Sequence, residues 1–481
     1  MSPSFSTPTP VISLRDFGWR HAGRARPALH GLSCDIFPGE RVLLLGTSGA
    51  GKSTLLAALA GVYGPTSGVD PEDGEYLGHI TVRERVGLVL QDPDAQAVAA
   101  RVGDDVAFGL ENMAVPREEI WPRVEEALRT VGLSPELGLH DSTQTLSGGQ
   151  KQRLALAGVL AMRPGIVALD EPTANIDPES IPGLVRAPLD AVEATGATLL
   201  VVEHRLEPWL PHIDRIIVLG EGGIRADGPR EDVLARHADA LRDEGIWVPG
   251  PPPELPVART ADRARPTTAE PLLEARGLDV GWTPDHPVRR AIDLRIEAGQ
   301  GVCITGHNGA GKSTLALTLG GLLPPLGGEV RAGKSLCAGL RSPHPHQWRS
   351  RELAARIGTV FQHPEHQFLC RTVREELAFG RTPEERVEEL LDRLRLRHVA
   401  AASPFALSGG EKRRLSVGTA LGGAHGPSLL ILDEPTFGQD RRTFAELVCL
   451  LRELSEEGTA VVAVTHDPLV VGALGDEEVR L

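Results

Sequence analysis

The stretch RVLLLGTSGAGKSTLLAALAG (residues 41–61) decides the fold of this chain. It joins a short apolar run, a glycine-rich turn and the start of a helical pattern, as expected where a buried parallel strand leads into a helix. The stretch GVCITGHNGAGKSTLALTLGG (301–321) repeats this order. Because parallel strands are joined by crossover helices, the sequence predicts an α/β fold twice.

Three further motifs also occur twice, in the same order along the chain. The pairs are LSGGQ (146–150) with LSGGE (407–411), VALDEPT (167–173) with LILDEPT (430–436), and VVEH (201–204) with AVTH (463–466). Each second copy lies about 260 residues after the first. This period is far longer than that of a solenoid repeat, so it indicates two copies of one domain.

A proline-rich stretch separates the two copies. Residues 248–271, VPGPPPELPVARTADRARPTTAEP, are rich in Pro, Ala, Arg and Thr and show no apolar periodicity. This composition is typical of a stiff, solvated linker. We therefore expect domain 1 at residues 1–247, the linker at 248–271 and domain 2 at 272–481.

Composition narrows the class of protein. Of the 481 residues, 41% are hydrophobic, which supports globular domains, and the net charge of −15 argues against broad nucleic-acid binding. The five cysteines are scattered, without a CxxC pair, which favours reduced thiols over a zinc site or disulfides. We expect no signal peptide and no membrane span, so that any membrane role depends on partner proteins.

The pattern G-x-x-x-x-G-K-[ST] is met at Gly46–Ser53 and again at Gly306–Ser313. Its glycines let backbone N–H groups turn toward phosphate oxygens, and its lysine, Lys52 or Lys312, reaches the β- and γ-phosphates of ATP. The alternative is a plain glycine-rich turn, but a strand precedes and a helix follows both copies. The predicted nucleotide contacts are Gly46, Ser48, Gly49, Gly51, Lys52, Ser53, Thr54, Gly306, Asn308, Gly309, Gly311, Lys312, Ser313 and Thr314.

Acidic pairs end two apolar strands, at Asp170-Glu171 and Asp433-Glu434. The aspartates suit a Mg²⁺ site, and the glutamates that follow can orient or deprotonate the attacking water. The alternative is an Asp-Glu helix cap before proline. The predicted Mg²⁺ ligands are Ser53, Gln91, Asp170, Ser313, Gln362 and Asp433.

Two more polar residues per copy follow apolar runs. Gln91 and Gln362 can sense Mg²⁺ and the attacking water, and His204 and His466 can bond the γ-phosphate. A lone glutamine here is usually a surface residue and a lone strand-end histidine is usually structural. Their repetition in both copies favours a catalytic role.

The LSGG motifs place a serine and two glycines at a helix N-terminus, which makes a second anion site. Set against the phosphate loop of the other domain, this site would close over the γ-phosphate of ATP. We therefore expect the two domains to pair head to tail within the chain. The predicted residues are Ser147, Gly148, Gly149, Gln150, Ser408, Gly409, Gly410 and Glu411.

Together these motifs resemble those of the ATP-binding cassette (ABC) ATPases, and the resemblance covers nearly the whole chain. It implies two P-loop nucleotide-binding domains, each with a RecA-like core, an antiparallel β subdomain and a helical subdomain. It also implies that Trp19 and Trp282 stack on adenine, although either could be a core tryptophan. Asp177 and Asp440 look like residues of the loops at the seam between the domains.

The segments QDPDAQ…DDVAFG and QHPEHQ…TVREELAFG are similar to those of energy-coupling-factor (ECF) transporters, which take up vitamins and metal ions. In that family this stretch forms the groove that receives helices of the transmembrane coupling subunit. Asp94, Gln96, Glu365 and Gln367 would line it, and an acidic groove suits Arg-bearing helices. The alternative is a solvated acidic helix start.

This resemblance implies a peripheral ATPase at the cytoplasmic face of the membrane, with a coupling (T-type) subunit and a substrate-binding membrane subunit as partners. The VVEHRLE stretch (201–207) favours a thiamine precursor as substrate, and cobalt or nickel stays open. The competing functions are a tandem ABC protein that acts on ribosomes, a DNA-repair ATPase and a sugar-importer ATPase. The short linker, the absence of cysteine clusters and the intact motifs of both copies argue against them in turn.

Overall fold

The computed structural model divides the chain into two compact units, Met1–Pro251 and Pro252–Leu481, which are considered separately below. It describes residues 9–22, 27–47, 49–63, 74–93, 95–134, 137–173, 176, 180–220, 222–259, 270–307, 309–380, 382–423, 426–436 and 438–481. Three predicted site residues of the first unit, Ser48, Asp94 and Asp177, and Asn308 of the second lie outside the described residues.

The first unit is built on a six-stranded sheet with the strand order β5-β6-β7-β3-β8-β9. The first five strands in that order run parallel, and β9 is antiparallel to β8. A smaller antiparallel sheet has the order β2-β1-β4. The strands are β1 (Ile12–His21), β2 (Leu29–Ile36), β3 (Arg41–Leu45), β4 (Gly74–Val82), β5 (Val86–Val89), β6 (Ile166–Asp170), β7 (Thr198–Val202), β8 (Arg215–Gly220) and β9 (Gly223–Pro229).

Alternate residues of the central strands enter different cores, because successive side chains of a strand point to opposite faces. Leu43 and Leu45 of β3 belong to a core with the helical part of the unit. Val42 and Leu44 belong to a second core, with the small antiparallel sheet and helix α1. The parallel sheet is thus covered on both faces, which explains why its strands are apolar throughout.

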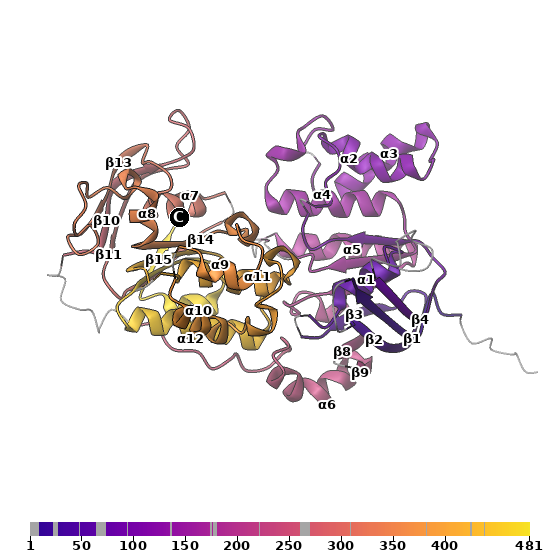
Figure 1. Ribbon diagram of the computed structural model, residues 1–481. Helices are drawn as coiled ribbons and strands as arrows, with labels where there is room; N and C mark the ends of the chain where they lie inside the picture. Colours follow the sequence, from indigo (N-terminus) through magenta and orange to yellow (C-terminus); the bar gives the residue numbers. More distant parts are fainter. Residues whose placement is uncertain are drawn as a thin grey trace, which may run out of the picture. The chain divides into compact units, whose positions relative to one another are not determined.

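Helices α2, α3 and α4 form a separate helical group in the first unit. Within it α4 lies nearest to α5, with α2 and α3 on its other side (Figure 1). Pro122 and Pro188 lie inside α3 and α5. The helices are α1 (Lys52–Leu59), α2 (Val102–Asn112), α3 (Arg117–Thr130), α4 (Gly148–Ala161), α5 (Ile181–Thr195) and α6 (Arg230–Asp243), with short 3₁₀ turns η2 (Thr143–Thr145) and η3 (Leu210–His212).

The second unit repeats this plan with a five-stranded parallel sheet, β14-β15-β16-β12-β17, and an antiparallel sheet, β11-β10-β13. Its strands are β10 (Leu273–Val280), β11 (Arg289–Ile296), β12 (Gly301–Thr305), β13 (Gly327–Ala332), β14 (Ile357–Val360), β15 (Leu429–Asp433), β16 (Ala460–Val464) and β17 (Glu477–Arg480). Its helices are α7 (Lys312–Leu319), α8 (Ser350–Ala354), α9 (Val373–Ala378), α10 (Glu384–Arg393), α11 (Gly409–Ala420), α12 (Arg441–Glu456) and α13 (Pro468–Leu474). The α/β fold predicted twice is therefore confirmed.

The stretch assigned to the linker contacts both units at its ends. An Arg242 side-chain N–H donates to the Pro249 carbonyl at 2.5 Å. Farther on, the Arg259 N–H donates to Asp476 Oδ1 at 2.6 Å, and the same oxygen accepts from Arg452 at 2.8 Å. The predicted solvated spacer is thus anchored in part, and its limits at 248 and 271 stay a prediction.

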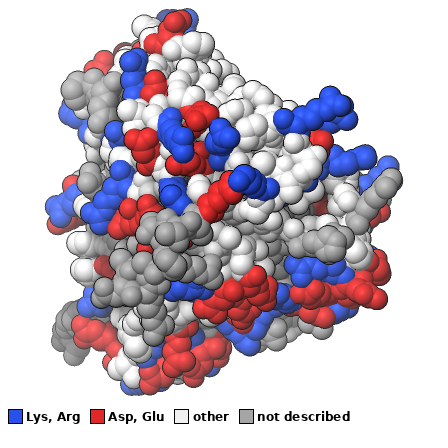
Figure 2. Space-filling model, turned by 90° about the vertical axis from the view of Figure 1, so that its left-hand side faces the viewer, with Lys and Arg blue, Asp and Glu red and all other residues white. Residues whose placement is uncertain are grey.

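The surface drawn in Figure 2 carries both signs of charge. Lys and Arg side chains alternate there with Asp and Glu instead of forming one continuous basic surface. This distribution agrees with the acidic net charge of the chain. Among the described residues, no helix is long and apolar enough to cross a bilayer.

Candidate functional site

The phosphate loop of the first unit joins β3 to α1. Gly46 and Gly51 lie at φ 159° and 85°. A Cβ at Gly51 would lie 2.4 Å from the carbonyl oxygen of Ala28, so this position requires glycine. Lys52 is buried, and its Nζ donates to the carbonyl oxygens of Gly46 and Thr47 at 2.9 and 3.1 Å. The loop is therefore closed by its own lysine, with the ammonium held at the center where a phosphate would lie.

The second unit builds the same loop between β12 and α7. Lys312 Nζ donates to the carbonyl oxygens of Gly306 and His307 at 2.8 and 3.0 Å. Gly311 has φ 93°, as the corresponding glycine does in the first unit. Both loops lead directly into the N-terminus of a helix, α1 or α7, which is the arrangement that binds phosphate.

The strand-end aspartates carry the features of a Mg²⁺ site. Asp170 is buried at the end of β6 and accepts a hydrogen bond from Ser53, the serine of the phosphate loop. Burial raises the pKa of Asp170 to about 6, although the Ser53 hydrogen bond opposes the shift. Among the described residues, its Oδ1 atom is buried without a hydrogen-bond partner. An orphaned carboxylate oxygen beside a serine hydroxyl fits a hard divalent cation.

Asp433 of the second unit repeats this arrangement with Ser313. Burial raises its pKa, and the Ser313 hydrogen bond and the charge of Arg413 oppose the shift. Asp170 and Asp433 therefore have equivalent surroundings. Among the described residues, the charge of an arginine acts on Asp433, whereas Lys52 and His204 act on Asp170.

The two glutamates that follow adopt a strained backbone. Glu171 and Glu434 have φ values of 48° and 49°, in the left-handed region that non-glycine residues rarely enter. The Glu171 N–H donates to the Val202 carbonyl at 2.9 Å, and the Glu434 N–H donates to Val464 at 3.0 Å. Such strain costs about 1–3 kcal/mol and concentrates at functional sites. The same strain recurs at equivalent positions of the two units, and the catalytic role of both glutamates stays a prediction.

Gln91 and His204 converge on Glu171 from two different elements. Gln91 Nε2 donates to Glu171 Oε2 at 2.8 Å, and His204 Nε2 lies 3.0 Å from Oε1. Burial would raise the pKa of Glu171, but the charge and hydrogen bond of His204 outweigh it and lower the pKa. In the second unit the distance from His466 Nε2 to Glu434 Oε1 is 3.6 Å. The predicted glutamate and histidine therefore lie together in both units.

The signature motifs begin helices α4 and α11 through capping boxes. Ser147 accepts from the N–H of Gln150 at 3.3 Å, and Gln150 Oε1 accepts from the N–H of Ser147 at 3.0 Å. In α11 the Ser408 hydroxyl also donates to Glu411 at 2.8 Å, and His398 lies 2.9 Å from that carboxylate. Each signature motif thus forms the capped N-terminus of a helix, and its role as a second anion site stays a prediction.

Asp440, predicted at the seam, caps a helix in this structure. Its Oδ1 accepts from the N–H of Thr443 at the start of α12, at 2.8 Å. Its proposed role across the seam stays a prediction.

The two tryptophans do not occupy equivalent positions. Trp19 is 3% exposed, and its ring stacks on Tyr63 with centroids 4.8 Å apart. In the strand register Trp19 lies opposite Leu29, as Val280 lies opposite Arg289, so Val280 is its counterpart. Because its ring is covered by core neighbours, the adenine role expected for Trp19 is wrong in this structure.

Trp282 lies two residues after Val280 and is 67% exposed, so its ring is open to a ligand. Its counterpart in the first unit is His21, which lies two residues after Trp19. His21 Nε2 is 3.3 Å from Thr54 Oγ1, at the edge of the phosphate-loop helix. The tryptophans were matched by their distance from the phosphate loops, which does not identify His21. Aligning β1 with β10 pairs His21 with Trp282.

Gln96 and Gln367 brace the glutamine loops. Gln96 Oε1 accepts from the Leu90 N–H at 2.9 Å, and its Nε2 donates to the Leu88 carbonyl at 3.1 Å. Gln367 makes the matching bonds to Phe361 and Thr359 at 2.9 and 3.0 Å. Both side chains are half-buried, and their role in lining a groove stays a prediction.

Glu365, also expected in the groove, accepts from Lys412 Nζ at 3.0 Å. Burial would raise the pKa of Glu365, but hydrogen bonds from its own backbone and from Lys412 outweigh it and lower the pKa. Its charge is thus largely matched within the unit.

Two acidic residues that the sequence did not single out shape the same segments. Asp105 Oδ1 accepts from the N–H groups of Val98 and Ala99, both at 2.8 Å. Glu376 Oε2 accepts from Leu369 and Cys370 at 2.9 and 2.7 Å. These residues are the acids of the two E/D-[VL]-A-F-G motifs, so the repeat itself was the available signal.

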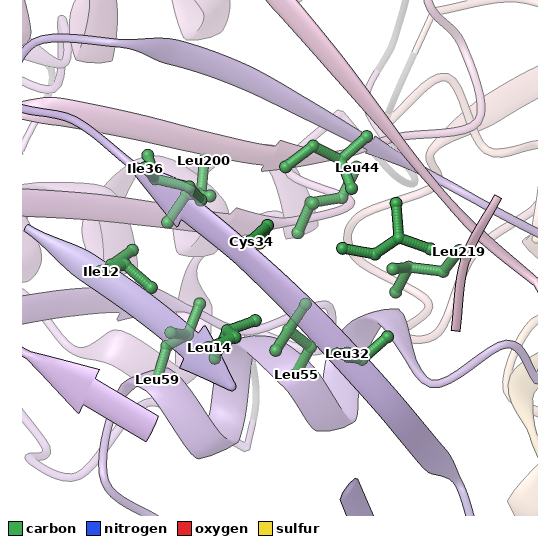
Figure 3. A pocket seen from close by; sticks show the side chains of 12 residues that line it. Ile12, Leu14, Leu32, Cys34, Ile36, Leu44, Leu55, Leu59, Leu200 and Leu219 are labelled. Carbon is green, nitrogen blue, oxygen red and sulfur yellow. The ribbon is translucent and has the colours of Figure 1, made fainter. Parts of the chain in front are cut away.

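The first unit encloses a small apolar cavity that is separate from this site. Its volume is about 10 Å³, and leucine and isoleucine side chains of β1, β2, α1 and the central strands point into it (Figure 3). Cys34 lines it, and burial raises the pKa of this thiol to about 11. The cavity holds at most one water molecule and offers no polar partner, so it is a packing defect and no ligand site.

The sequence of the chain is similar to those of known proteins. The family model described as "ABC transporter" matches residues 29–174 and 290–437. The chain is 36% identical to the Bacillus subtilis (strain 168) protein named "Putative HMP/thiamine import ATP-binding protein YkoD", over 97% of this chain and 89% of that protein. It is 32% identical to a "Putative ABC transporter ATP-binding protein" of Methanosarcina mazei, over 95% and 85% of the two chains.

Among solved structures, the fold is similar to that of the archaeal ribosome recycling factor aABCE1, crystallised with ribosomal stalk protein aP1. The TM-score is 0.61 at 22% identity, over 96% of this chain and 86% of that one. At this identity the likeness concerns the fold alone.

Proposed function

The chain belongs to the ABC transporter family, and we propose that its ATP hydrolysis drives solute uptake through membrane partners. As an ABC ATPase it hydrolyses ATP and uses Mg²⁺. The proposal concerns what this hydrolysis is coupled to and which residues carry it out.

Within each unit the geometry supports a division of labour. Lys52 would hold the β- and γ-phosphates, and Ser53 with Asp170 would hold Mg²⁺, whose charge would offset that of the phosphates. Glu171, fixed by Gln91 and His204, would orient and deprotonate the attacking water. The corresponding set in the second unit is Lys312, Ser313, Asp433, Glu434, Gln362 and His466.

We further propose that each ATP is held between the two units. The signature residues of α4 and α11 form capped helix N-termini, which suit an anion. Ser408 and Asp440 would then face the Lys52 site, and Ser147 and Asp177 would face the Lys312 site. Binding of ATP would close the units, and hydrolysis would reopen them.

Matching exposed apolar side chains support a membrane partner, and they are the observation that carries this proposal. Val98 and Leu369 occupy the same position after the two glutamine loops and are 59% and 72% exposed. Phe108 and Phe379 form a second equivalent pair, 48% and 59% exposed. Exposed apolar groups repeated at the same place in both units indicate a binding surface. Asp105 and Glu376 hold its backbone in place.

The partner we propose is the coupling subunit of an ECF-type importer, together with a substrate-binding membrane subunit. The chain would then lie at the cytoplasmic face of the membrane. The thiamine-related name of the Bacillus subtilis relative supports a vitamin precursor as substrate, with cobalt or nickel as the alternative.

The experiment is purification of the tagged chain from membranes after Phe108→Asp and Phe379→Asp are introduced together. Charges on the proposed surface should abolish co-purification of integral membrane proteins, while ATP binding stays within twofold of the unaltered chain. Val62→Asp with Leu322→Asp is the matched control, since these exposed apolar residues follow the phosphate-loop helices of the two units.

Retained membrane partners in the Phe108/Phe379 variant would overturn the surface assignment. Recovery of ribosomes in place of membrane proteins with the unaltered chain would replace transport with the translation-related function.

A further inference from the structure

In the first unit a buried carboxylate, Glu203, contacts the loop that follows the proposed water-activating glutamate. Glu203 is 5% exposed and directly follows β7, immediately before His204. The equivalent residue of the second unit is Thr465, which is fully buried before His466. Burying a carboxylate requires strong compensation from hydrogen bonds.

Both oxygens of Glu203 are engaged with the loops that carry the site. Oε1 accepts from the backbone N–H of Thr173 at 2.9 Å and also from the Thr173 hydroxyl. Oε2 accepts from the N–H groups of His204 at 3.0 Å and Arg205 at 3.4 Å. Thr173 lies two residues after Glu171 on the loop that follows β6. The Glu203 side chain thus joins that loop to the loop that carries His204.

Thr465 forms a different bond in the second unit. Its Oγ1 accepts from the N–H of Asp467 at 3.0 Å, within its own loop. A threonine hydroxyl is also too short and has too few acceptor sites to replace four hydrogen bonds to a carboxylate. Consistently, the histidine-to-glutamate distance is 3.0 Å in the first unit and 3.6 Å in the second.

We propose that Glu203 is a positioning residue for ATP hydrolysis, which locks the Glu171 loop to the His204 loop so that the first site is preset and the second is not. This inference rests on the water-activating role proposed for Glu171. A preset site spends less free energy on ordering its groups during the reaction, so positioning affects kcat more than KM.

Hydrogen exchange tests the lock without relying on catalysis. In the full chain carrying Glu203→Thr, amide exchange in peptides covering 171–174 and 203–206 should become at least tenfold faster. Peptides covering 434–436 and 465–468 of the same molecule are the internal control and should not change. Thr465→Val is the matched variant, and it should leave exchange in the first unit unchanged. Unaltered exchange of 171–174 and 203–206 in Glu203→Thr would overturn the proposal.

Kinetics test the consequence in a chain whose second site is disabled by Glu434→Gln. There Glu203→Thr should lower kcat about tenfold and leave KM for ATP within twofold. Glu203→Gln should be intermediate, because one amide oxygen can still accept from Thr173. Thr173→Val should add nothing to Glu203→Thr, since both remove the same tie.

A merely structural role predicts other results. If Glu203→Thr lowered the folded fraction but left turnover per folded molecule unchanged, the positioning role would be wrong. If exchange increased as expected but Glu171→Gln kept full turnover, the lock would stand and the role proposed for Glu171 would fail.

Discussion

The two units share one scaffold yet differ in the charges placed behind it. In both units the lysine of the phosphate loop donates to two backbone carbonyls, and the glutamate that follows the strand-end aspartate has φ near 50°. Behind that frame the first unit has Glu203 where the second has Thr465. The second has Arg413 on α11 where the first has Gln152 on α4, and both of these are nearly fully buried. The two sites therefore differ in the titratable groups beside them, although their backbone geometry is the same.

The largest expected effect concerns the two glutamates. Changing Glu171 and Glu434 together to glutamine should lower ATP turnover about a thousandfold, because a general base contributes roughly 10²–10⁴-fold. The single Glu171→Gln change should cost more than Glu434→Gln, since the first site is the more firmly positioned. Steady-state phosphate release measures this, with ATP binding as the control. Equal losses from the two single changes would remove the asymmetry.

The next effect separates the two tryptophans. Trp19→Ala should lower the free energy of unfolding of the first unit by about 3–5 kcal/mol, as for other buried aromatic residues. Trp282→Ala should leave stability nearly unchanged and weaken nucleotide binding by about 1 kcal/mol, roughly fivefold in Kd. Urea unfolding and nucleotide titration measure the two quantities. A stable Trp19→Ala variant with weakened nucleotide binding would restore the adenine role of Trp19.

These cases show what sequence could predict and what it could not. The phosphate loops, strand-end acids and duplicated fold follow from local patterns that allow few structures. The position of Trp19 depends on strand register, which shifts at bulges in β1 and β10 and cannot be counted from the phosphate loop. The inward direction of Gln96 depends on backbone groups that the loop leaves unpaired. The residue types at the candidate site could therefore be predicted from sequence motifs, whereas the directions of their side chains depend on the tertiary structure.

A smaller effect concerns two equivalent buried residues, Gln152 of α4 and Arg413 of α11. Arg413 donates to the Phe361 carbonyl at 2.9 Å, and burial lowers its pKa to about 10. Arg413→Gln should cost the second unit about 2 kcal/mol of unfolding free energy, because a hydrogen bond from a buried charged group is lost. Gln152→Met in the first unit is the matched change. Its Nε2 has no partner among the described residues, so this change should be neutral or stabilising by about 1 kcal/mol.

Urea unfolding of the two variants measures this difference. Equal destabilisation by Arg413→Gln and Gln152→Met would show that the buried guanidinium has no special role in the second unit.

The smallest effect is the pH dependence of Mg²⁺ binding at the two sites. Burial raises the pKa of Asp170 to about 6, so this carboxyl takes up a proton as the pH falls through 6 and then competes with Mg²⁺. At pH 5 the apparent Mg²⁺ affinity of the first site should be about tenfold below its value at pH 7.5, as expected one unit below the pKa. At Asp433 the charge of Arg413 opposes the rise in pKa, so Arg413 should protect Mg²⁺ binding at the second site when the pH falls.

The measurement is the Mg²⁺ concentration for half-maximal ATP turnover between pH 5 and 8, in Glu434→Gln for the first site and Glu171→Gln for the second. Both sites bind the same nucleotide, so the titration of ATP itself cancels in the comparison. Adding Arg413→Gln to the Glu171→Gln chain removes the opposing charge and should shift the loss of Mg²⁺ binding at the second site to higher pH. If that curve does not move, the charge of Arg413 does not reach the metal site, and the sites differ only in the lock at Glu203.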